Sequence, residues 1–185
     1  ARRYLREAKG GSAIIWFEAI SIVPEGRSSA TQLYLCRENL DSYKRLTQAV
    51  KEACLQVNGF APYLVMQANH SGRYSNPDNK PAPIIAYRHP ELEQYRAADN
   101  SCIVTDDYLK ALEEKFGEAA LLAREAGFDA VDIKSCHGYL LAELTSAFTR
   151  PGAYGGSYEN RTRLLKNAIC AAKVYETDDF MVTSR

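Results

Sequence analysis

The sequence predicts an α/β fold in which parallel strands alternate with helices. Short apolar runs of strand length recur along the 185 residues, and longer amphipathic stretches of helical length separate most of them. Such alternation is typical of parallel strands joined by right-handed crossovers. The composition is that of a soluble globular protein, with 46% hydrophobic and 25% charged residues. Four strands are too few to close an eight-stranded barrel, so an open sheet and part of a barrel are equally acceptable from the pattern alone.

The first half of the chain contains two helix–strand pairs. Gly10-Gly11 ends a first helix, and the apolar run after it has the length of a strand buried on both faces. Asp41 is placed to cap a longer helix whose apolar residues recur at helical spacing. A second apolar run ends at Gln67. The four elements are expected at residues 3–8 (helix), 13–17 (strand), 41–56 (helix) and 63–66 (strand).

The second half repeats this alternation after a long connection. Residues 71–104 show no periodicity and contain four prolines, and so long a loop inside a domain is usually either functional or disordered. Thr105 caps the longest helix, whose acidic first turn suits the positive end of the helix dipole. The remaining elements are expected at residues 108–125 (helix), 130–133 (strand), 157–175 (helix) and 180–182 (start of a strand).

Charge and composition exclude several classes of function. The net charge is zero, whereas binding to nucleic acids or to anionic membranes needs a basic face, so neither partner is expected. No apolar run approaches the roughly 20 residues of a spanning helix, and the N-terminus does not resemble a signal peptide. The five scattered cysteines indicate free thiols in a reducing compartment, and hence a cytoplasmic protein. Three histidines without ligand spacing predict that no metal is bound.

The residues most informative about chemistry follow the strand at 130–133. Lys134, His137 and Tyr139 come just beyond its carboxyl end, which is the face where catalytic groups sit in barrels of alternating strands and helices. Each of them taken alone is better explained as a satisfied polar side chain at a strand end. If the backbone stays extended, residues 137 and 139 point the same way, and Lys134 needs a bend to join them. Residues 154–157 then form a glycine turn before a capped helix, which we interpret as structural.

Two strings in this region resemble motifs of the Old Yellow Enzyme family of flavin-dependent ene-reductases. Residues 134–141 (Lys-Ser-Cys-His-Gly-Tyr-Leu-Leu) are similar to the family's His-x-x-His/Asn-Gly-Tyr-Leu, except that Lys134 stands where most members have the first His. Residues 154–161 match the family's Tyr-Gly-Gly-Ser-x-Glu-Asn-Arg, and residues 67–73 are similar to its Gln-Leu-x-His-Ala-Gly-Arg. The resemblance implies one partial (β/α)8 TIM-barrel domain over residues 1–185, an FMN oxidoreductase fragment with strands two to five. Strand one, strands six to eight and the main phosphate-binding loops are then expected to lie outside it.

The resemblance also implies roles for the residues after the 130–133 strand. In the family, the pair matching Lys134 and His137 binds the substrate's oxygen, and the Tyr matching Tyr139 donates a proton. The chemistry fits, because fixed donors stabilise the negative charge that builds on the oxygen, and a phenol can act as general acid. Lys134 also allows a different substrate, a different reaction, or a structural ion pair with a residue such as Asp132 or Glu143.

Three further residues are implied to contact FMN. The Gln67 carboxamide supplies a donor and an acceptor suited to the pyrimidine edge of the flavin. Arg185 matches an Arg near the flavin N1 and O2 atoms, and Ala19 matches a small residue close to the ring. For Ala19, an ordinary position at a strand end is an equally good interpretation.

The expected function is therefore that of an FMN-dependent oxidoreductase of the Old Yellow Enzyme type. NADH or NADPH is the hydride donor, and the substrate is a small molecule with an activated C=C bond. Amine oxidation or demethylation is an alternative within the same class. The chain begins without Met and stops at Arg185 directly after an apparent strand, which suggests a piece of something larger. A non-catalytic half barrel is thus another alternative, and its exposed edges and apolar inner face predict self-association into a homo-oligomer.

Overall fold

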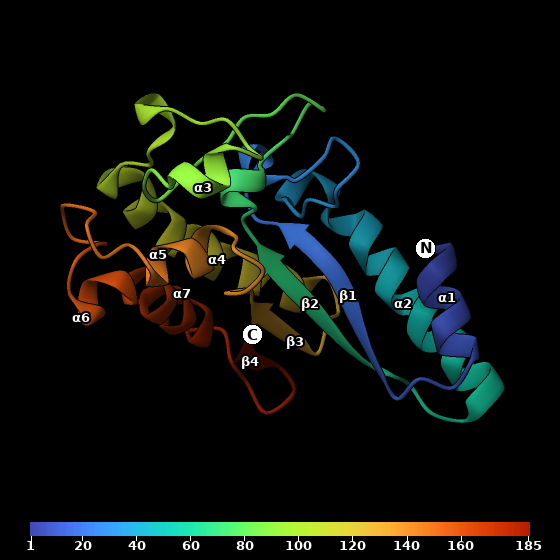
Figure 1. Ribbon diagram of the computed structural model, residues 1–185. Helices are drawn as coiled ribbons and strands as arrows, with labels where there is room; N and C mark the ends of the chain where they lie inside the picture. Colours follow the sequence, from blue (N-terminus) through green and yellow to red (C-terminus); the bar gives the residue numbers. More distant parts are fainter.

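The computed structural model describes residues 1–185 and contains one sheet of four parallel strands in the order β1-β2-β3-β4. This confirms the predicted α/β fold, and each strand pairs with the next one along the chain, as in a barrel. Figure 1 shows the strands in the middle of the molecule with helices packed against them. The strands are β1 (Ile14–Ser21), β2 (Tyr63–Asn69), β3 (Ala130–Ile133) and β4 (Met181–Ser184).

Long helices precede or connect the strands, and short helical turns lie in the loops. The long helices are α1 (Arg2–Lys9), α2 (Leu40–Asn58), α4 (Asp106–Glu125) and α7 (Arg163–Lys173). The short helices are α3 (Pro90–Glu93), α5 (Leu140–Thr145) and α6 (Tyr158–Arg161). Single 3₁₀ turns occur at Pro24–Gly26, Arg37–Asn39, Gly72–Tyr74 and Asn100–Cys102. No helix combines the length and the apolar character needed to cross a bilayer.

Several elements differ from the sequence prediction, and three of them do so for an identifiable reason. Strand β1 continues to Ser21, because a register shift between Trp16 and Ala19 lets the strand bend and stay paired with β2. The helix expected over residues 157–175 is divided at Thr162, where φ is −97° and ψ is −3°, so that it forms α6 and α7. Helix α5 was not predicted, since its six residues are too few to show a helical period.

One face of the sheet packs against the helices and forms the main core. Phe17 of β1 is 2% exposed, and its ring stacks on Tyr4 of α1 at a centroid distance of 3.8 Å. The same ring meets Phe128 edge-on at 4.8 Å, which joins α1 to the turn before β3. Figure 1 shows α1 and α2 next to each other beside β1. The core residues of the strands include Ile15, Phe17, Ile20, Leu64, Met66, Ala68, Val131 and Ile133.

The opposite face would be the inner surface of a barrel, and its lower part is open. Trp16, Val65, Ala130 and Met181 pair across the four strands, and their side chains therefore share this face. Trp16 is 46% exposed and Met181 53%, and Ile14, two residues before Trp16, is 61% exposed. The prediction that residues 13–17 are buried on both faces is thus wrong. Half of that strand faces a side that no helix covers, in line with the expected apolar inner face.

The long connection between β2 and α4 is folded back on itself. Ile85 donates a backbone hydrogen bond to Cys102 (2.9 Å), and Val104 donates one to Ile85 (2.9 Å). These bonds form an isolated bridge that closes the excursion containing α3. In Figure 1 the excursion lies beyond the arrowheads of β1 and β2, which is the carboxyl end of the sheet. The connection therefore covers the end of the sheet at which the predicted site residues lie.

Replacing Phe17 by Ala is expected to lower the free energy of unfolding by about 3–5 kcal/mol, because the change leaves a cavity between α1, the sheet and Phe128. Urea unfolding followed by circular dichroism measures this loss. The matched control is Ile14→Ala, three residues away on the open face, which should cost about 0.5 kcal/mol or less. Equal losses in the two variants would contradict the assignment of the two faces.

Candidate functional site

The pairing register brings four side chains to one level of the sheet. Ala19 pairs with Gln67, Gln67 with Asp132, and Asp132 with Thr183. Partners in register point to the same face of a parallel sheet, and Trp16, Val65, Ala130 and Met181 form the level below on that face. This level is therefore on the inner face, close to the carboxyl end of the strands.

Lys134 and Arg185 lie at the next level, directly beyond β3 and β4. Alternation along β3 places the Lys134 side chain on the same face as that of Asp132. The Arg185 amide donates to the carbonyl of Ile133 (3.4 Å), and its carbonyl accepts from the Ser135 amide (2.7 Å). The structure thus brings four of the predicted site residues to one edge of the sheet, namely Ala19, Gln67, Lys134 and Arg185.

A sharp bend brings Lys134, His137 and Tyr139 together. His137 and Gly138 both have positive φ, 62° and 65°, so the chain reverses there instead of staying extended. After the bend, the Nζ atom of Lys134 lies 4.2 Å from the centroid of the Tyr139 ring. The His137 ring lies edge-on to Tyr139, with centroids 6.4 Å apart. The extended backbone that was the condition for residues 137 and 139 to point the same way is therefore not present, and the chain bends at residues 137–138.

Tyr139 lies in an aromatic and cationic environment. Its ring is 5.6 Å from that of Tyr74, and the Arg96 guanidinium lies over the Tyr74 ring at 5.3 Å. Burial raises the pKa of Tyr139 and the neighbouring Tyr74 raises it further, whereas the positive charge of Arg96 lowers it. Because the net shift is upward, the phenol stays protonated at neutral pH and is available as a proton donor.

Lys134 is buried and forms no ion pair. Lys134 is 5% exposed, and burial lowers the pKa of its ammonium group. The Asp132 carboxylate raises that pKa only from beyond ion-pair distance. The structural ion pair considered for Lys134 does not form, since Glu143 pairs with Arg73 and Asp132 accepts a hydrogen bond from Gln67. Its closest defined contact is the face of Tyr139.

Gln67 and Asp132 form a polar pair on the inner face. Gln67 Nε2 donates to Asp132 Oδ2 at 2.7 Å. The other carboxylate oxygen, Oδ1, is buried and has no hydrogen-bond partner. Burial raises the pKa of Asp132, while the hydrogen bond from Gln67 opposes the shift. A buried oxygen without a partner is costly, so a ligand with a hydrogen-bond donor would be stabilised at this position.

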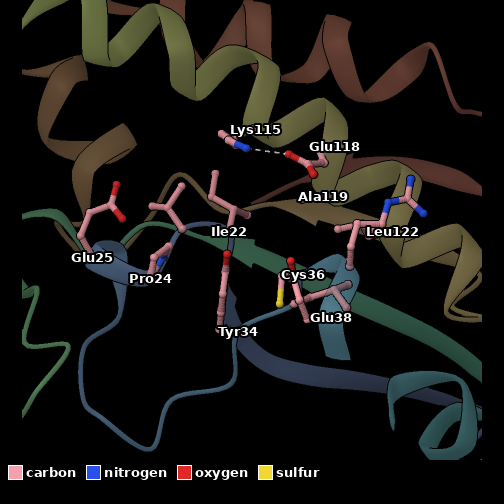
Figure 2. Close-up of a pocket in the computed structure, with 13 residues that line it drawn as sticks. Ile22, Pro24, Glu25, Tyr34, Cys36, Glu38, Lys115, Glu118, Ala119 and Leu122 are labelled. Carbon is pink, nitrogen blue, oxygen red and sulfur yellow. Dashed lines mark hydrogen bonds and ion pairs between the residues drawn. The ribbon is translucent and has the colours of Figure 1, made fainter. Parts of the chain in front are cut away.

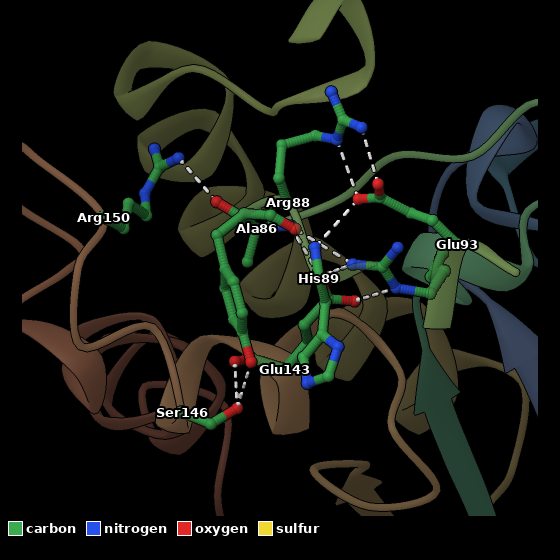
Figure 3. A network of polar contacts seen from close by, with 9 residues as sticks. Ala86, Arg88, His89, Glu93, Glu143, Ser146 and Arg150 are labelled. Carbon is green, nitrogen blue, oxygen red and sulfur yellow. Dashed lines mark hydrogen bonds and ion pairs between the residues drawn. The ribbon is translucent and has the colours of Figure 1, made fainter. Parts of the chain in front are cut away.

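A buried ion pair attaches the long connection to α5. Arg73 Nη2 donates to Glu143 Oε1 at 2.7 Å and to the Tyr87 carbonyl at 2.9 Å, while the Ala86 amide donates to the same Glu143 oxygen at 3.1 Å. Figure 3 shows this network between the connection and the helix. Burial raises the pKa of Glu143, and the Arg73 guanidinium opposes that shift. Because α5 begins directly after Tyr139, the pair also helps to fix that residue.

A second buried chain of hydrogen bonds holds the loops after β1 and β2. The Gly72 amide donates to His70 Nδ1 (3.0 Å), His70 Nε2 contacts the Tyr108 hydroxyl (2.9 Å), and Tyr108 donates to Glu25 (2.8 Å). Gly72 has a φ of +57°, and a Cβ there would lie 2.7 Å from the amide nitrogen of Leu140. The end of β2 and the start of α5 thus touch at a position where only Gly fits.

The glycine turn at residues 154–157 is structural, as interpreted from the sequence. Ser157 accepts a hydrogen bond from the Asn160 amide and caps α6. Gly155 lies against Arg150, since a Cβ there would be 2.3 Å from the Arg150 carbonyl oxygen. Tyr154 donates to Glu113 of α4 at 2.7 Å, so the motif attaches this loop to the helix layer.

Sequence reasoning did not identify Tyr74 and Arg96 as neighbours of the site. Tyr74 directly follows the Gly72-Arg73 string, so its position after a strand end was the available signal. Arg96 lies in the aperiodic connection and offers no local signal. Both come near Tyr139 through the folding of residues 71–104.

A separate cavity of about 340 Å³ lies between α4 and the loops after β1 (Figure 2). Its charged groups include Lys115 and Glu118, which pair with each other at 2.8 Å. No predicted site residue lines it, so this cavity is distinct from the carboxyl end of the sheet. The lining residues include Ile22, Pro24, Glu25, Tyr34, Cys36, Glu38, Ala119 and Leu122.

Comparison with known proteins supplies the family. The model of the NADH:flavin oxidoreductase / NADH oxidase family matches residues 1–185. The chain belongs to this family. The match confirms the resemblance to Old Yellow Enzyme, and FMN together with NADH or NADPH are the cofactors that membership implies.

Relatives with curated names include NADPH dehydrogenases of several bacteria. The chain is 34% identical to the one from Halalkalibacterium halodurans over 168 residues, which is 90% of the chain and 46% of the relative. It is also 34% identical to the one from Clostridium acetobutylicum, over 92% of the chain and 48% of the relative. The chain therefore spans about half the length of these relatives.

Solved structures share the fold at lower identity. A 2-naphthoyl-CoA reductase in complex with 2-naphthoyl-CoA superposes with a TM-score of 0.83 and 22% identity, over 98% of this chain and 29% of that one. Histamine dehydrogenase from Rhizobium sp. 4-9 superposes with a TM-score of 0.76 and 21% identity, over 100% of this chain and 27% of that one. These matches agree with part of a TIM barrel and show the fold alone.

The residues at the carboxyl end suit a flavin ring. The ring edge carries both an N–H donor and carbonyl acceptors, and the protein offers the unpaired Asp132 oxygen, the Gln67 carboxamide and the cation of Arg185. Ala19 leaves room beside them, because its side chain is a single methyl group. The donor set therefore fits the ring of the family's cofactor.

Changing Glu143 to Gln is expected to lower the free energy of unfolding by about 3–5 kcal/mol, since it leaves the Arg73 charge buried without a partner. Chemical denaturation measures the change. Glu118→Gln removes one partner of the exposed Lys115 pair and is the matched control, with an expected cost below about 1 kcal/mol. A loss as small as that of the control would show that the buried pair does not hold the connection.

Stability should fall between about pH 6.5 and pH 4 because of His70. Burial lowers the pKa of His70 from 6.5 to about 4, so the unfolded chain binds more protons across this range. The contribution is complete above pH 6.5, is lost as the pH falls to 4, and amounts to about 3 kcal/mol. Unfolding experiments across this range should give a shallower slope for His70→Gln than for the wild type.

Proposed function

We propose that this chain forms the catalytic part of an FMN-dependent NAD(P)H oxidoreductase that reduces activated C=C bonds. The main support is the grouping of Lys134, His137 and Tyr139, which places three donors beyond the carboxyl end of β3. They lie at the same edge of the sheet as Gln67 and Arg185. The chain spans about half the length of its curated relatives, so we propose this activity for the whole protein of which these strands form the catalytic part. The five free cysteines favour the cytoplasm as the setting.

Gln67, Arg185 and the backbone at Ala19 are proposed to hold the isoalloxazine ring of FMN. When bound, FMN supplies a hydride to the substrate after its own reduction by NADH or NADPH. The Arg185 cation favours negative charge at the neighbouring ring edge. The Gln67 amide is held by Asp132 at 2.7 Å, so its carbonyl oxygen has a fixed direction and can accept a hydrogen bond.

Lys134 and His137 are proposed to donate hydrogen bonds to the electron-withdrawing group of the substrate. Negative charge grows on that group during reduction, and fixed donors stabilise it more strongly in the transition state than in the ground state. Tyr139 then donates its proton to the α-carbon as general acid. Burial supports this role, because it raises the pKa of Tyr139 and keeps the phenol protonated until the carbanion forms.

Two alternatives have specific observations in their favour. Amine oxidation is suggested by one structural neighbour, the 6-hydroxypseudooxynicotine amine oxidase of Pseudomonas geniculata N1, although 22% identity supports only the fold. Self-association is favoured by the exposed Ile14, Trp16 and Met181 on the inner face. Assaying a panel of enones beside methylated amines separates reduction from amine oxidation. Light scattering tests the second alternative, which a monomer without binding of a hydrophobic dye would contradict.

Replacing Tyr139 by Phe is expected to lower the rate of enone reduction by about 10²- to 10⁴-fold, the usual contribution of a positioned general acid. The flavin absorbance of the purified protein should not change, since Tyr139 is not proposed to hold the cofactor. Steady-state oxidation of NADPH with an enone measures the effect. Tyr95→Phe, at an 85% exposed tyrosine in the long connection, is the matched control and should retain full activity. Enone reduction at the wild-type rate by Tyr139→Phe would rule out the proton-donor role.

A further inference from the structure

Lys134 is the one buried cation of this chain that forms no ion pair. The buried cationic residues are Arg73, Lys134 and Arg150. Arg73 pairs with Glu143 at 2.7 Å, and Arg150 pairs with Asp106 at 2.6 Å. No carboxylate lies within ion-pair distance of Lys134.

The energetics of this arrangement favour an anionic ligand. Burying most of the Lys134 side chain has a desolvation cost, and the contact with the Tyr139 ring returns only about 1–2 kcal/mol. Arg96 lies over the ring of Tyr74, a neighbour of Tyr139, and it too forms no ion pair with a carboxylate. The surroundings of Tyr139 thus contain two cations that form no ion pair, and the Asp132 carboxylate acts on Lys134 only from beyond ion-pair distance.

We infer that the substrates of this site are α,β-unsaturated carboxylates, and that Lys134 binds the carboxylate group as the residue that determines this specificity. The inference rests on the proposed function and names its substrate class. A neutral carbonyl is already electron-withdrawing, and a neutral imidazole is a sufficient donor for it. A carboxylate is negative before the reaction begins, so adding a hydride to the conjugated alkene produces a second negative charge. A full positive charge in contact with the carboxylate lowers the energy of that dianion.

The reaction is balanced with the groups already named. NADH or NADPH is the two-electron donor of the proposed function. Hydride addition forms a C–H bond at the β-carbon, and the π pair of the C=C bond moves to form an enediolate, whose two oxygens Lys134 neutralises in part. The O–H bond of Tyr139 then breaks as its proton bonds to the α-carbon, and the enediolate returns to a carboxylate. Water reprotonates the phenolate. The net change is alkene acid plus NAD(P)H plus a proton to saturated acid plus NAD(P)⁺.

The position of Lys134 favours a carboxylate conjugated to the alkene over a distant anionic group. Lys134 is 5% exposed and touches Tyr139, the proposed proton donor, so its partner must lie near the reacting carbons. A coenzyme A thioester is neutral at the carbonyl next to its alkene, and its phosphates are far from that carbon. Such a thioester would leave Lys134 without an anion.

Isothermal titration calorimetry with 3-phenylpropanoate tests the inference without turnover. This saturated acid cannot be reduced, and its primary amide is the uncharged match. The flavin-loaded wild-type protein should bind the acid at least about 10-fold more tightly than the amide, since a hydrogen bond to a charged group is worth a factor of about 10 to 100. Lys134→Met should abolish this preference, and Lys134→Arg should largely keep it. Arg45→Gln removes an exposed cation of α2 and should match the wild type.

Several outcomes would overturn the inference. Equal binding of acid and amide by the wild type would do so, as would an unchanged preference in Lys134→Met. Loss of flavin absorbance in Lys134→Met, with the preference intact, would show that the lysine serves the cofactor instead. A kinetic comparison of cinnamate with methyl cinnamate adds a second measurement. The wild type should favour the acid in kcat/KM, and Lys134→His should shift the ratio toward the ester by about 10-fold or more.

Reduction of uncharged enones is measured separately, and it tests only the proposed function. Binding of the acid through Lys134 in a protein that reduces no alkene would contradict the proposed function and leave the carboxylate site standing. Reduction of enones without any preference for acids would support the proposed function and contradict the carboxylate site.

Discussion

The in-register pairing of four parallel strands determines where the site residues on and directly beyond the strands lie. Ala19, Gln67, Asp132 and Thr183 share one level because each pairs directly with the next. Since side chains alternate along a strand, this register also fixes which residues face the helices and which face the open side. A slip of one residue in β3 would turn Asp132 and Lys134 into the helix layer and bring Val131 and Ile133 to the inner face. The site is thus a consequence of register before any loop is considered.

A buried ion pair between the loops also constrains the position of Tyr139. Glu143 lies in α5, which begins directly after Tyr139, and it binds both Arg73 and the backbone of the long connection. The same connection contains Arg96, whose guanidinium lies over Tyr74. One ion pair therefore couples the position of the proposed proton donor to that of its aromatic and cationic neighbours. Removing either partner would leave a buried charge, so the arrangement is stable only as a whole.

Local signals predicted the fold well, and long-range contacts account for what they missed. The four strands and the long helices can be recognised in the sequence because their signals are local. Apolar runs mark the strands, and Thr105 and the glycine pairs mark ends of helices. The break at Thr162 has no such local signal. The extension of β1 to Ser21 has none either, since its register shift depends on the partner strand. For the site, the strand end located Lys134, His137 and Tyr139. The bend at His137 and the approach of Arg96 depend on tertiary structure, which no sequence window contains.

Placing cations beside Tyr139 would satisfy two requirements of its proposed role as proton donor that usually conflict. Before the reaction the phenol must hold its proton, and burial together with Tyr74 provides for this by raising its pKa. After donation the phenolate must be tolerable, and the positive charges of Lys134 and Arg96 lie close enough to stabilise it. A bound anion would neutralise Lys134 in the reactant state, so less of its charge would act on the phenol at that stage. As the α-carbon takes the proton, negative charge moves from the substrate to the Tyr139 phenolate. Lys134, which would bind the substrate's negative group, is already in contact with the Tyr139 ring.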